Sequence, residues 1–245
     1  MNKMNIEING NIGAGKTTFL HIMGKTFENS TIVDEPVKEW KETVDESKEN
    51  ILHKFYKDPK RWAYSFQNIA YITRAKKTED SIRNSSSRYN FFDRSIKTDK
   101  YVFEKMLHEA GHISDIEHKM YNMWYDFYHQ YVRKETYNII IYLRCDPMVA
   151  YERIQKRNRI EEKDITLEYL TEVHRYHEEW LNNENNNNDH IITIDCNKDF
   201  EHDIVYQQEI IDIVKSYLAN KLYYQLKENL YCNDNFNGMF TNSFC

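Results

Sequence analysis

Short apolar runs alternate along the chain with longer stretches in which apolar positions recur every three or four residues. The first pattern predicts strands and the second predicts helices. The run from Ile139 to Leu143 is continuously apolar, as is typical of a strand that is covered on both faces. Predicted strands span residues 4–9, 30–34, 89–93, 138–143 and 190–195.

The helical pattern fills the stretches between these strands. Predicted helices span residues 17–27, 47–56, 60–82, 98–110, 114–134, 147–158, 166–182 and 200–228. Strands that are separated by helices favour a parallel sheet with right-handed crossovers. We therefore expect an α/β fold in which a parallel five-stranded sheet is flanked by helices.

Neither an internal repeat nor a domain linker is evident, and 245 residues suit a single domain. We expect this domain to span residues 1–232, followed by a disordered tail at 233–245. The Asn-rich stretch 182–189 is expected to be a mobile loop. One predicted helix carries aromatic side chains that belong either to the core or to a subunit interface: Tyr121, Trp124, Tyr125, Phe127, Tyr128 and Tyr131.

Composition narrows the possible partners. The formal net charge is −6, which argues against general binding to nucleic acid or a membrane surface. No apolar run approaches membrane-spanning length, and the N-terminus resembles neither a signal peptide nor a transit segment. The cysteines form no C-x-x-C pair, so thiols in a reducing compartment are expected instead of a zinc site. The resulting expectation is a soluble, cytoplasmic protein.

A glycine-rich stretch near the N-terminus carries the strongest chemical signal. Its sequence is Gly10-Asn11-Ile12-Gly13-Ala14-Gly15-Lys16-Thr17-Thr18, which fits G-x-x-x-x-G-K-[ST], the phosphate-binding loop of nucleoside-triphosphate enzymes. Glycines let backbone N–H groups curl around an anion, at the start of a predicted helix. Lys16 supplies a charge for the β- and γ-phosphates, and the Thr17 hydroxyl can bind Mg²⁺. The loop predicts binding of a nucleoside triphosphate.

Acidic side chains follow two of the predicted strands. Glu35 follows the second strand and Asp93 ends the third, so both should lie beyond the carboxyl ends of the sheet, near the phosphate loop. A carboxylate at Glu35 could accept a proton from an attacking hydroxyl or hold Mg²⁺ through water. Asp93 could face Mg²⁺, while Arg94 counters charge at the reacting groups. Taken alone, the acid after the second strand could equally cap a helix, and Asp93-Arg94 could be only an ion pair.

Arg153, Arg157 and Arg159 lie just after the fourth predicted strand. Converging guanidinium groups could stabilise the charge that spreads over a transferring phosphoryl group. The polar stretch 158–164 makes a mobile lid plausible. The alternative interpretation is a solvated basic helix face.

Another predicted helix carries Phe66, Gln67, Ala70 and Arg74, of which the last three share one face. A glutamine carboxamide can donate to one base atom and accept from its neighbour, and a phenylalanine ring can supply a stacking surface. The segment could equally be an ordinary amphipathic helix.

Taken together, these motifs resemble the deoxyribonucleoside kinase family, in the branch of deoxycytidine kinases, deoxyguanosine kinases and the insect multisubstrate enzyme. The resemblance runs in register from about residue 6 to residue 200, which is most of the chain. Eight phrases carry it in the family's order: GNIGAGKTTFL (10–20), DEPVKEW (34–40), FYKDPKRWAYSFQ (55–67), FFDRS (91–95), IYLRCDP (141–147), RIQKRNRIEE (153–162), LEYLTEVHRYHEEWL (167–181) and DCNKDF (195–200).

The resemblance implies a P-loop kinase fold with ATP as donor, Mg²⁺, and a lid at about residues 153–164. It implies that Glu35 is the catalytic base for the 5′-hydroxyl of a deoxynucleoside, and that Arg94 contacts this hydroxyl and the transferred phosphoryl group. Lys16 is expected to share in catalysis. Tyr56 and Glu162 match the pair that holds the sugar 3′-hydroxyl.

The remaining matches divide between the two substrates. Gln67 matches the glutamine that reads the base, and the expected pocket around it comprises Trp40, Leu52, Phe55, Phe66 and Phe103. The expected ATP site comprises residues 10–18, Arg153, Arg157, Arg159, Asp199 and Phe200. The family phrase is usually Glu-Arg-Ser, whereas this chain has Asp93-Arg94-Ser95, so Asp93 could hold Mg²⁺ through an added water.

Base preference follows from three positions that tune it in the family, here Ala70, Arg74 and Asp99. Thymidine-accepting members have small or apolar residues where this chain has Arg74 and Asp99. An Arg–Asp pair would place charge and bulk where the thymine 5-methyl group would otherwise fit. We therefore expect deoxycytidine or a purine deoxynucleoside to be preferred over thymidine.

The resulting prediction is an enzyme that moves a phosphoryl group from ATP to a deoxynucleoside, and that forms a homodimer as the family suggests, with the helices at 98–134 as a plausible surface. Two alternatives stay open. One is a nucleoside monophosphate kinase of the thymidylate type, which shares the phosphate loop and Asp93-Arg94. The other is a nucleotide-binding subunit without turnover of its own.

Overall fold

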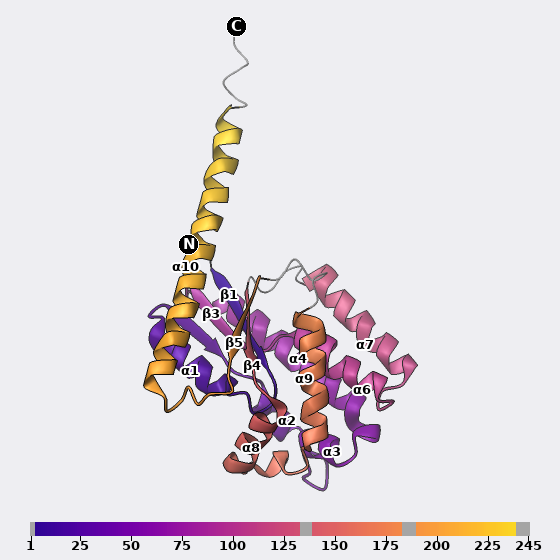
Figure 1. Cartoon of the computed structure of the whole chain (residues 1–245). Helices are drawn as coiled ribbons and strands as arrows, with labels where there is room; N and C mark the ends of the chain where they lie inside the picture. The colour runs from indigo at the N-terminus through magenta and orange to yellow at the C-terminus, as the bar shows by residue number, and fades with distance from the viewer. Residues whose placement is uncertain (1–2, 133–138, 183–189, 239–245) are drawn as a thin grey trace. The chain divides into compact units, whose positions relative to one another are not determined.

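Five parallel strands form one sheet in the order β2-β3-β1-β4-β5 (Figure 1). The strands are β1 (Met4–Gly10), β2 (Ser30–Val33), β3 (Tyr89–Asp93), β4 (Ile139–Arg144) and β5 (His190–Asp195). The computed structural model describes residues 3–132, 139–182 and 190–238. The predicted strands and the α/β fold class with a parallel five-stranded sheet are confirmed.

The strand order determines where a ligand can bind. β1 lies between β3 and β4, and the chain winds outward from β1 to either side. In such sheets ligands bind beyond the carboxyl ends of the strands where the winding direction reverses. The register places Ile8 opposite Asp93, so the phosphate loop after β1 and the turn after β3 begin side by side.

Helices cover both faces of the sheet, with α1 on one side and α4, α6, α7 and α9 on the other (Figure 1). The α-helices are α1 (Lys16–Thr26), α2 (Val37–Glu42), α3 (Ile51–Lys57), α4 (Pro59–Asn84), α5 (Ile96–Thr98), α6 (Lys105–Glu109), α7 (Asp115–Phe127), α8 (Pro147–Arg157), α9 (Leu167–Leu181) and α10 (Ile204–Gly238). Three turns of other helix types are the π-helices η1 (Asp99–Glu104) and η2 (Tyr128–Val132) and the 3₁₀-helix η3 (Ile160–Glu162).

The chain forms two compact units, Met1–Lys198 and Asp199–Cys245. The whole sheet belongs to the first unit, where one buried cluster joins β4 to α3, α4 and α9. The second unit contains α10, which continues to Gly238. The predicted tail beyond residue 238 and most of the Asn-rich stretch, residues 183–189, lie outside the described residues.

One predicted helix begins at a different residue, and one short helix was not predicted. The helix predicted at 47–56 begins only at Ile51, because Val44 and Asn50 form an isolated antiparallel bridge and the Asn50 side chain caps the helix. The short helix α2 was not predicted, since Pro36 precedes only six helical residues. It carries Trp40 into the buried cluster beside α4.

Helix α4 begins with a strong local signal. The Asp58 side chain accepts a hydrogen bond from the Arg61 backbone N–H, and Pro59 occupies the first helical position. Both features are favoured at helix N-termini. The helix then presents Phe66, Gln67, Ala70 and Arg74 as buried side chains, as its predicted face required.

The aromatic stripe of α7 and η2 divides between core and surface. Tyr121, Tyr125 and Tyr128 are buried against α4, where the Tyr71 ring meets Tyr121 and Tyr128. The opposite side of the same helix exposes a continuous set of large apolar side chains: Ile116, Met120, Met123, Trp124 and Phe127, with Tyr131 beyond its end. None of the helices in the described part of the chain combines the length and hydrophobicity that a membrane span requires.

Candidate active site

The phosphate loop joins β1 to α1 and is held in a backbone shape that glycine permits. Gly13 has φ +86°, and a Cβ atom there would lie 2.4 Å from the Ala150 carbonyl oxygen of α8. The Lys16 ammonium group lies inside the loop, where it donates to the carbonyl oxygens of Gly10 (3.1 Å) and Asn11 (2.8 Å). The loop therefore surrounds a buried positive charge.

The other loop residues have distinct environments. Asn11 is buried, and its side-chain amide donates to the Leu170 carbonyl oxygen of α9 at 2.8 Å. The Thr17 side chain is exposed in the first turn of α1, where it is available to a ligand of the loop. The loop is thus tied to α9 on one side and open at Thr17.

Glu35, just beyond β2, receives two guanidinium groups. Its Oε1 accepts from Arg94 at 2.7 Å and from Arg74 at 2.9 Å. Arg74 also donates to Asp99 (2.8 Å) and to the Asp93 carbonyl oxygen (2.8 Å). The structure thus brings residues from α4, from η1 and from the turns after β2 and β3 into one charge chain, Asp99–Arg74–Glu35–Arg94.

Arg94 lies at a backbone position of unusual geometry. Its φ is +63°, in the left-handed region that non-glycine residues rarely adopt, and its backbone N–H donates to the Ile8 carbonyl oxygen at 3.0 Å. The guanidinium group also donates to the Gly10 carbonyl oxygen at 3.2 Å, while its Nε has no hydrogen-bond partner. The strained turn points the Arg94 side chain toward both Glu35 and the phosphate loop.

The charge chain holds Glu35 ionised. Burial alone would raise the pKa of its carboxyl group, but Arg94, Arg74 and Lys16 outweigh this effect and lower the pKa to about 2. The pKa of Lys16 is also lowered, to about 7, because burial and the nearby Arg94 guanidinium both disfavour its charged form. Both shifts reflect charges packed closely in a site that has little solvent.

Asp93 fits the chemistry of a metal-binding group. Its side chain is buried, Oδ1 has no hydrogen-bond partner, and burial together with Glu35 raises its pKa. Within the described residues no three His, Cys, Asp or Glu side chains cluster as a metal site. A cation here would therefore need further oxygen ligands from a nucleotide or water.

The aromatic rings expected around the base pack together near Arg74, the partner of Glu35, whose guanidinium lies 5.8 Å from the Trp40 ring. The Phe55 and Phe66 rings stack at 4.7 Å, and Trp40 meets Phe66 edge-on at 5.3 Å. Trp40 is fixed by its indole N–H, which donates to Thr73 at 3.0 Å. Leu52 and Ala70 belong to the same buried cluster.

Two further residues expected in the base pocket lie in this part of the site. Gln67 is 2% exposed, and its side-chain Oε1 has no hydrogen-bond partner. The Phe103 ring lies below the Arg94 guanidinium, 5.0 Å from it. A buried amide with a free acceptor beside aromatic rings can recognise a flat polar ligand.

Tyr56 and Glu162, expected at the sugar, lie within electrostatic reach of each other. Burial raises the pKa of Tyr56 strongly, and Tyr169, Glu162 and Glu35 add to the effect. Glu162 is held by Arg157, whose two guanidinium nitrogens each lie 2.6 Å from one carboxylate oxygen. Arg159 also approaches Glu162, at 3.7 Å.

The three arginines after β4 do not converge on one point. Arg157 and Arg159 face Glu162, whereas Arg153 donates to the carbonyl oxygens of Cys196 (2.8 Å) and Lys198 (3.1 Å) in the turn after β5. Instead of the expected single cluster, the arginines therefore make two separate sets of contacts. Arg153 and Arg157 do share a helix face, as their spacing required, but they form hydrogen bonds with different partners.

Asp199 and Phe200 lie in the second unit, in the turn that precedes α10. The Asp199 carboxylate accepts from the backbone N–H groups of Glu201 (3.1 Å) and His202 (3.3 Å), and the Phe200 carbonyl oxygen accepts from Gln207 (2.9 Å). These bonds give the turn a defined backbone before the helix begins at Ile204.

Tyr169 is a site residue that the sequence analysis did not single out. Its ring meets Tyr56 edge-on at 6.2 Å, and Arg94 influences its pKa, which burial raises. The phrase LEYLTEVHRYHEEWL contains it, but the helical pattern of that phrase does not distinguish it from its other aromatic residues. Only the packing of α9 against α3 identifies it.

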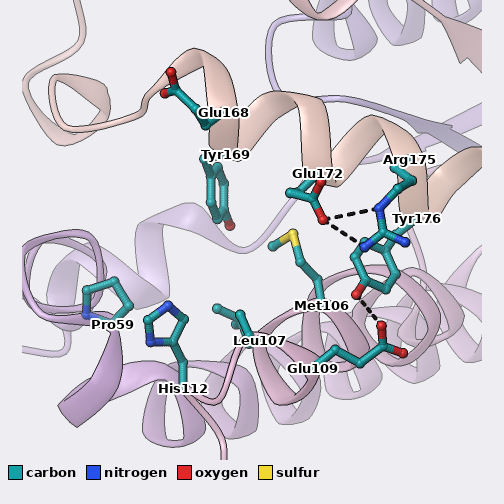
Figure 2. Close-up of a pocket in the computed structure, with 11 residues that line it drawn as sticks. Pro59, Met106, Leu107, Glu109, His112, Glu168, Tyr169, Glu172, Arg175 and Tyr176 are labelled. Carbon is teal, nitrogen blue, oxygen red and sulfur yellow. Dashed lines mark hydrogen bonds and ion pairs between the residues drawn. The ribbon is translucent and has the colours of Figure 1, made fainter.

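Tyr169 also lines a cavity of about 410 Å³ between α6 and α9 (Figure 2). The cavity is lined by Pro59, Met106, Leu107, Glu109, Ala110, His112, Glu168, Tyr169, Glu172, Arg175 and Tyr176 (Figure 2). The charged groups on one side are already paired, because Arg175 contacts Glu172 and the Tyr176 hydroxyl donates to Glu109. The cavity thus shares a wall with the candidate active site.

Comparison with known proteins agrees with this geometry. Residues 6–219 match the family model described as deoxynucleoside kinase. A mitochondrial deoxyguanosine kinase of Xenopus laevis is 33% identical, with 87% of this chain and 89% of that protein aligned. Deoxycytidine kinase 2 of Gallus gallus is 35% identical (88% and 90% covered), and deoxycytidine kinase of Homo sapiens is 32% identical (87% and 90% covered).

The match covers the phosphate loop, the charge chain around Glu35, the aromatic pocket and the arginines after β4. A resemblance suggested by short phrases therefore extends over nearly all of the first unit and into the second. The chain belongs to the deoxynucleoside kinase family and is an enzyme that phosphorylates deoxynucleosides.

Proposed function

We propose that this enzyme transfers the γ-phosphoryl group of ATP to the 5′-hydroxyl of a deoxynucleoside, with Glu35 as the general base. The observation that carries the proposal is the position of the Glu35 carboxylate. It lies between Arg94 and Arg74, near the aromatic rings expected around the base and close enough to Lys16 for the two charges to interact. A hydroxyl held between this carboxylate and the phosphate loop would be suitably placed for attack on a phosphoryl group.

The charge chain suggests how Glu35 becomes an effective base. A carboxylate whose pKa is about 2 is ionised at neutral pH but binds a proton weakly. A triphosphate in the loop would draw Arg94 and Lys16 toward its own negative charge. The pKa of Glu35 would then rise, so that it accepts the proton as the hydroxyl attacks.

The same phosphate group would replace the present partners of Lys16. The Lys16 ammonium group donates to two loop carbonyl oxygens, which is a weaker arrangement than contact with a phosphate. Arg157 and Arg159 are proposed to join it when the lid, about residues 153–164, closes. Closure would also release Glu162 from Arg157, which leaves this carboxylate and Tyr56 to hold the sugar 3′-hydroxyl.

Magnesium fits the site on the chemistry of its side chains. We propose that Thr17 and Asp93 hold Mg²⁺ together with phosphate oxygens and water, because Asp93 has an unpartnered buried oxygen and the Thr17 hydroxyl is exposed at the loop. The cation would neutralise charge on the phosphates of the bound donor. Asp199 and Phe200 are proposed to hold the adenine, within one kinase domain at residues 1–232.

Two alternatives are less well supported. A nucleoside monophosphate kinase would need free basic groups around the acceptor phosphate, whereas Arg74 and Arg94 are both engaged with Glu35. A subunit without turnover would not need a candidate base that is held ionised beside a phosphate loop.

Base preference is proposed to favour deoxycytidine or a purine deoxynucleoside over thymidine. Arg74 and Asp99 are 4% and 2% exposed, so their charges cannot be separated without leaving one buried and unpaired. The pair therefore persists as a rigid charged wall, with Arg74 about one helical turn from Ala70 and about two turns from Gln67. Such a wall suits a polar base edge better than the methyl group of thymine.

A homodimer is proposed through the exposed apolar face of α7, the set Ile116, Met120, Met123, Trp124 and Phe127. Met123 is 71% exposed and Trp124 is 54% exposed, although both are large apolar side chains. A contiguous set of this kind on one helix face is typical of a protein–protein interface. Two copies packed through α7 would cover it.

We propose the cytoplasm as the compartment, since Cys145 and Cys196 are buried free thiols that suit reducing conditions. Cell fractionation of the tagged full chain checks this, and recovery in a mitochondrial fraction would contradict it.

The first prediction concerns the base. Glu35→Gln should lower kcat for deoxycytidine about 10²- to 10⁴-fold, the usual contribution of general-base catalysis, while nucleoside binding stays measurable by calorimetry. Asp34→Asn is the matched control, because Asp34 is an exposed neighbouring carboxylate and its loss should leave kcat unchanged. Near-normal turnover by the Glu35 variant would disprove the assignment.

The same assay of ADP release separates the alternatives. Deoxycytidine should be a far better acceptor than its 5′-monophosphate. Preference for the monophosphate would favour the monophosphate-kinase alternative, and the absence of ADP release with all four deoxynucleosides would favour a silent subunit.

The second prediction concerns base preference. The wild-type enzyme should phosphorylate thymidine weakly, and joint replacement of the pair by Arg74→Met and Asp99→Ala should raise the thymidine-to-deoxycytidine ratio of kcat/KM by at least about tenfold. The ratio is the appropriate measurement because Arg74 also supports Glu35, and a loss of that support affects both substrates. The single variant Arg74→Met leaves Asp99 unpaired and serves as the control. Equal wild-type turnover of thymidine and deoxycytidine would refute the proposal.

The third prediction concerns assembly. Replacing Met123 and Trp124 together by glutamate should convert a dimer into monomer in analytical ultracentrifugation, because charge on the α7 face would oppose its burial. Met148→Glu, which alters an exposed apolar side chain on α8, is the control and should leave the dimer intact. A wild-type chain that sediments as a monomer would rule out this interface.

A further inference from the structure

Four fully buried polar side chains lie side by side where β1 meets the turn after β3. They are Glu7 and Asn9 on β1, and Ser95 and Thr98 after β3, each with 0% exposure. The Asn9 amide donates to Glu7 Oε1, and the Thr98 hydroxyl oxygen lies 2.8 Å from Glu7 Oε1 and 2.6 Å from Asn9 Oδ1. The Ser95 backbone N–H also donates to the Thr98 hydroxyl oxygen, at 3.2 Å.

Counting the protons in this cluster determines the state of Glu7. The Thr98 hydroxyl has one proton, but it faces two acceptor oxygens, Glu7 Oε1 and Asn9 Oδ1. Both contacts can be hydrogen bonds only if Glu7 carries a proton of its own. A neutral Glu7 would donate to Thr98, Thr98 would donate to Asn9, and Asn9 would donate back to Glu7. The three side chains then form a closed ring.

The surroundings agree with a neutral acid. Burial raises the pKa of Glu7. Side-chain hydrogen bonds with Ser95, Thr98 and Asn9 and the charge of Lys97 act in the opposite direction but are outweighed. Glu7 Oε2 has no hydrogen-bond partner, which an ionised carboxylate would tolerate poorly in a fully buried position. Lys97 is the cation whose charge acts on Glu7, and Tyr125 of α7 lies close enough to Glu7 for the two groups to interact electrostatically.

The ring adjoins two backbone segments of the active site, the phosphate loop and the turn after β3. Asn9 immediately precedes Gly10, the first residue of the phosphate loop. Ser95 and Thr98 form a capping box directly after Arg94, and so hold the turn in which Arg94 has its left-handed backbone. Asp99, next to Thr98, is the partner of Arg74.

We propose that Glu7 is a positioning residue, held as a neutral carboxylic acid, whose ring with Asn9 and Thr98 fixes the phosphate loop relative to the turn that carries Asp93 and Arg94. It touches neither substrate. Its effect passes through Arg94 and the loop, so its loss should misplace groups that act in phosphoryl transfer more than groups that hold the nucleoside. This inference rests on the proposed function for its kinetic test alone.

The kinetic test uses two matched pairs of variants. Thr98→Val removes the hydroxyl and Thr98→Ser retains it, while Glu7→Leu removes the hydrogen-bonding group and Glu7→Gln retains one. Thr98→Val and Glu7→Leu should lower kcat about tenfold or more and leave KM for deoxycytidine within about threefold, because small displacements of reacting groups cost rate. Thr98→Ser and Glu7→Gln should keep most of the wild-type kcat.

A control distinguishes positioning from simple stability. Asn90 on β3 is also fully buried and bonds Asn5 at 3.0 Å, at the end of the strands away from the site. Asn90→Leu should lower the urea midpoint of unfolding without lowering kcat per folded molecule. Equal kcat losses in Asn90→Leu and Glu7→Leu, or wild-type kcat in a folded Glu7→Leu, would overturn the positioning role.

A spectroscopic test needs no substrate and no altered fold. The infrared difference spectrum between the wild type and Glu7→Gln at pH 7 should contain the carbonyl band of a neutral carboxylic acid. A difference that contains only carboxylate bands would overturn the neutral state. Since this measurement does not involve turnover, it remains decisive even if the roles proposed for Glu35 and Arg94 fail in their own assays.

Discussion

The charge chain Asp99–Arg74–Glu35–Arg94 is the interaction on which the rest of the site depends. Two acids and two arginines neutralise one another in a region with little water, where an unpaired charge would be costly. The chain links residues that are far apart in sequence, and each contributes from a different element. It keeps the carboxylate ionised and at the same time holds an arginine ready to move toward phosphate.

The fold explains why these residues can meet. A parallel sheet places the ends of its strands at one edge, so acids that follow β2 and β3 lie beside the loop that follows β1. Strand positions and the fold class followed from hydrophobic patterning because buried parallel strands are short apolar runs between helices. The phosphate loop followed from its own sequence, since glycine spacing and a lysine determine its shape locally.

Other parts of the site depend on side-chain directions that patterning does not contain. The sequence indicated Arg74 as a neighbour of the base, but its bond to Glu35 arises only when α4 packs beside β2. The three arginines after β4 were expected to act together. In the structure Arg153 instead bonds the turn after β5, and Arg157 bonds Glu162. The ring around Glu7 was not expected, because alternation of apolar and polar residues in a strand predicts that a glutamate faces solvent.

The contact between Gly13 and Ala150 constrains the sequence of the phosphate loop. A side chain at position 13 would collide with the backbone of α8 and approach Ile154, so the close packing of the phosphate loop on this helix depends on a glycine there. The helix ends at Arg157, and Asn158 caps it with a φ of +46°, a conformation that asparagine adopts more readily than most residues. This left-handed residue therefore separates the part of α8 that packs on the phosphate loop from Arg159, which lies beyond the helix end.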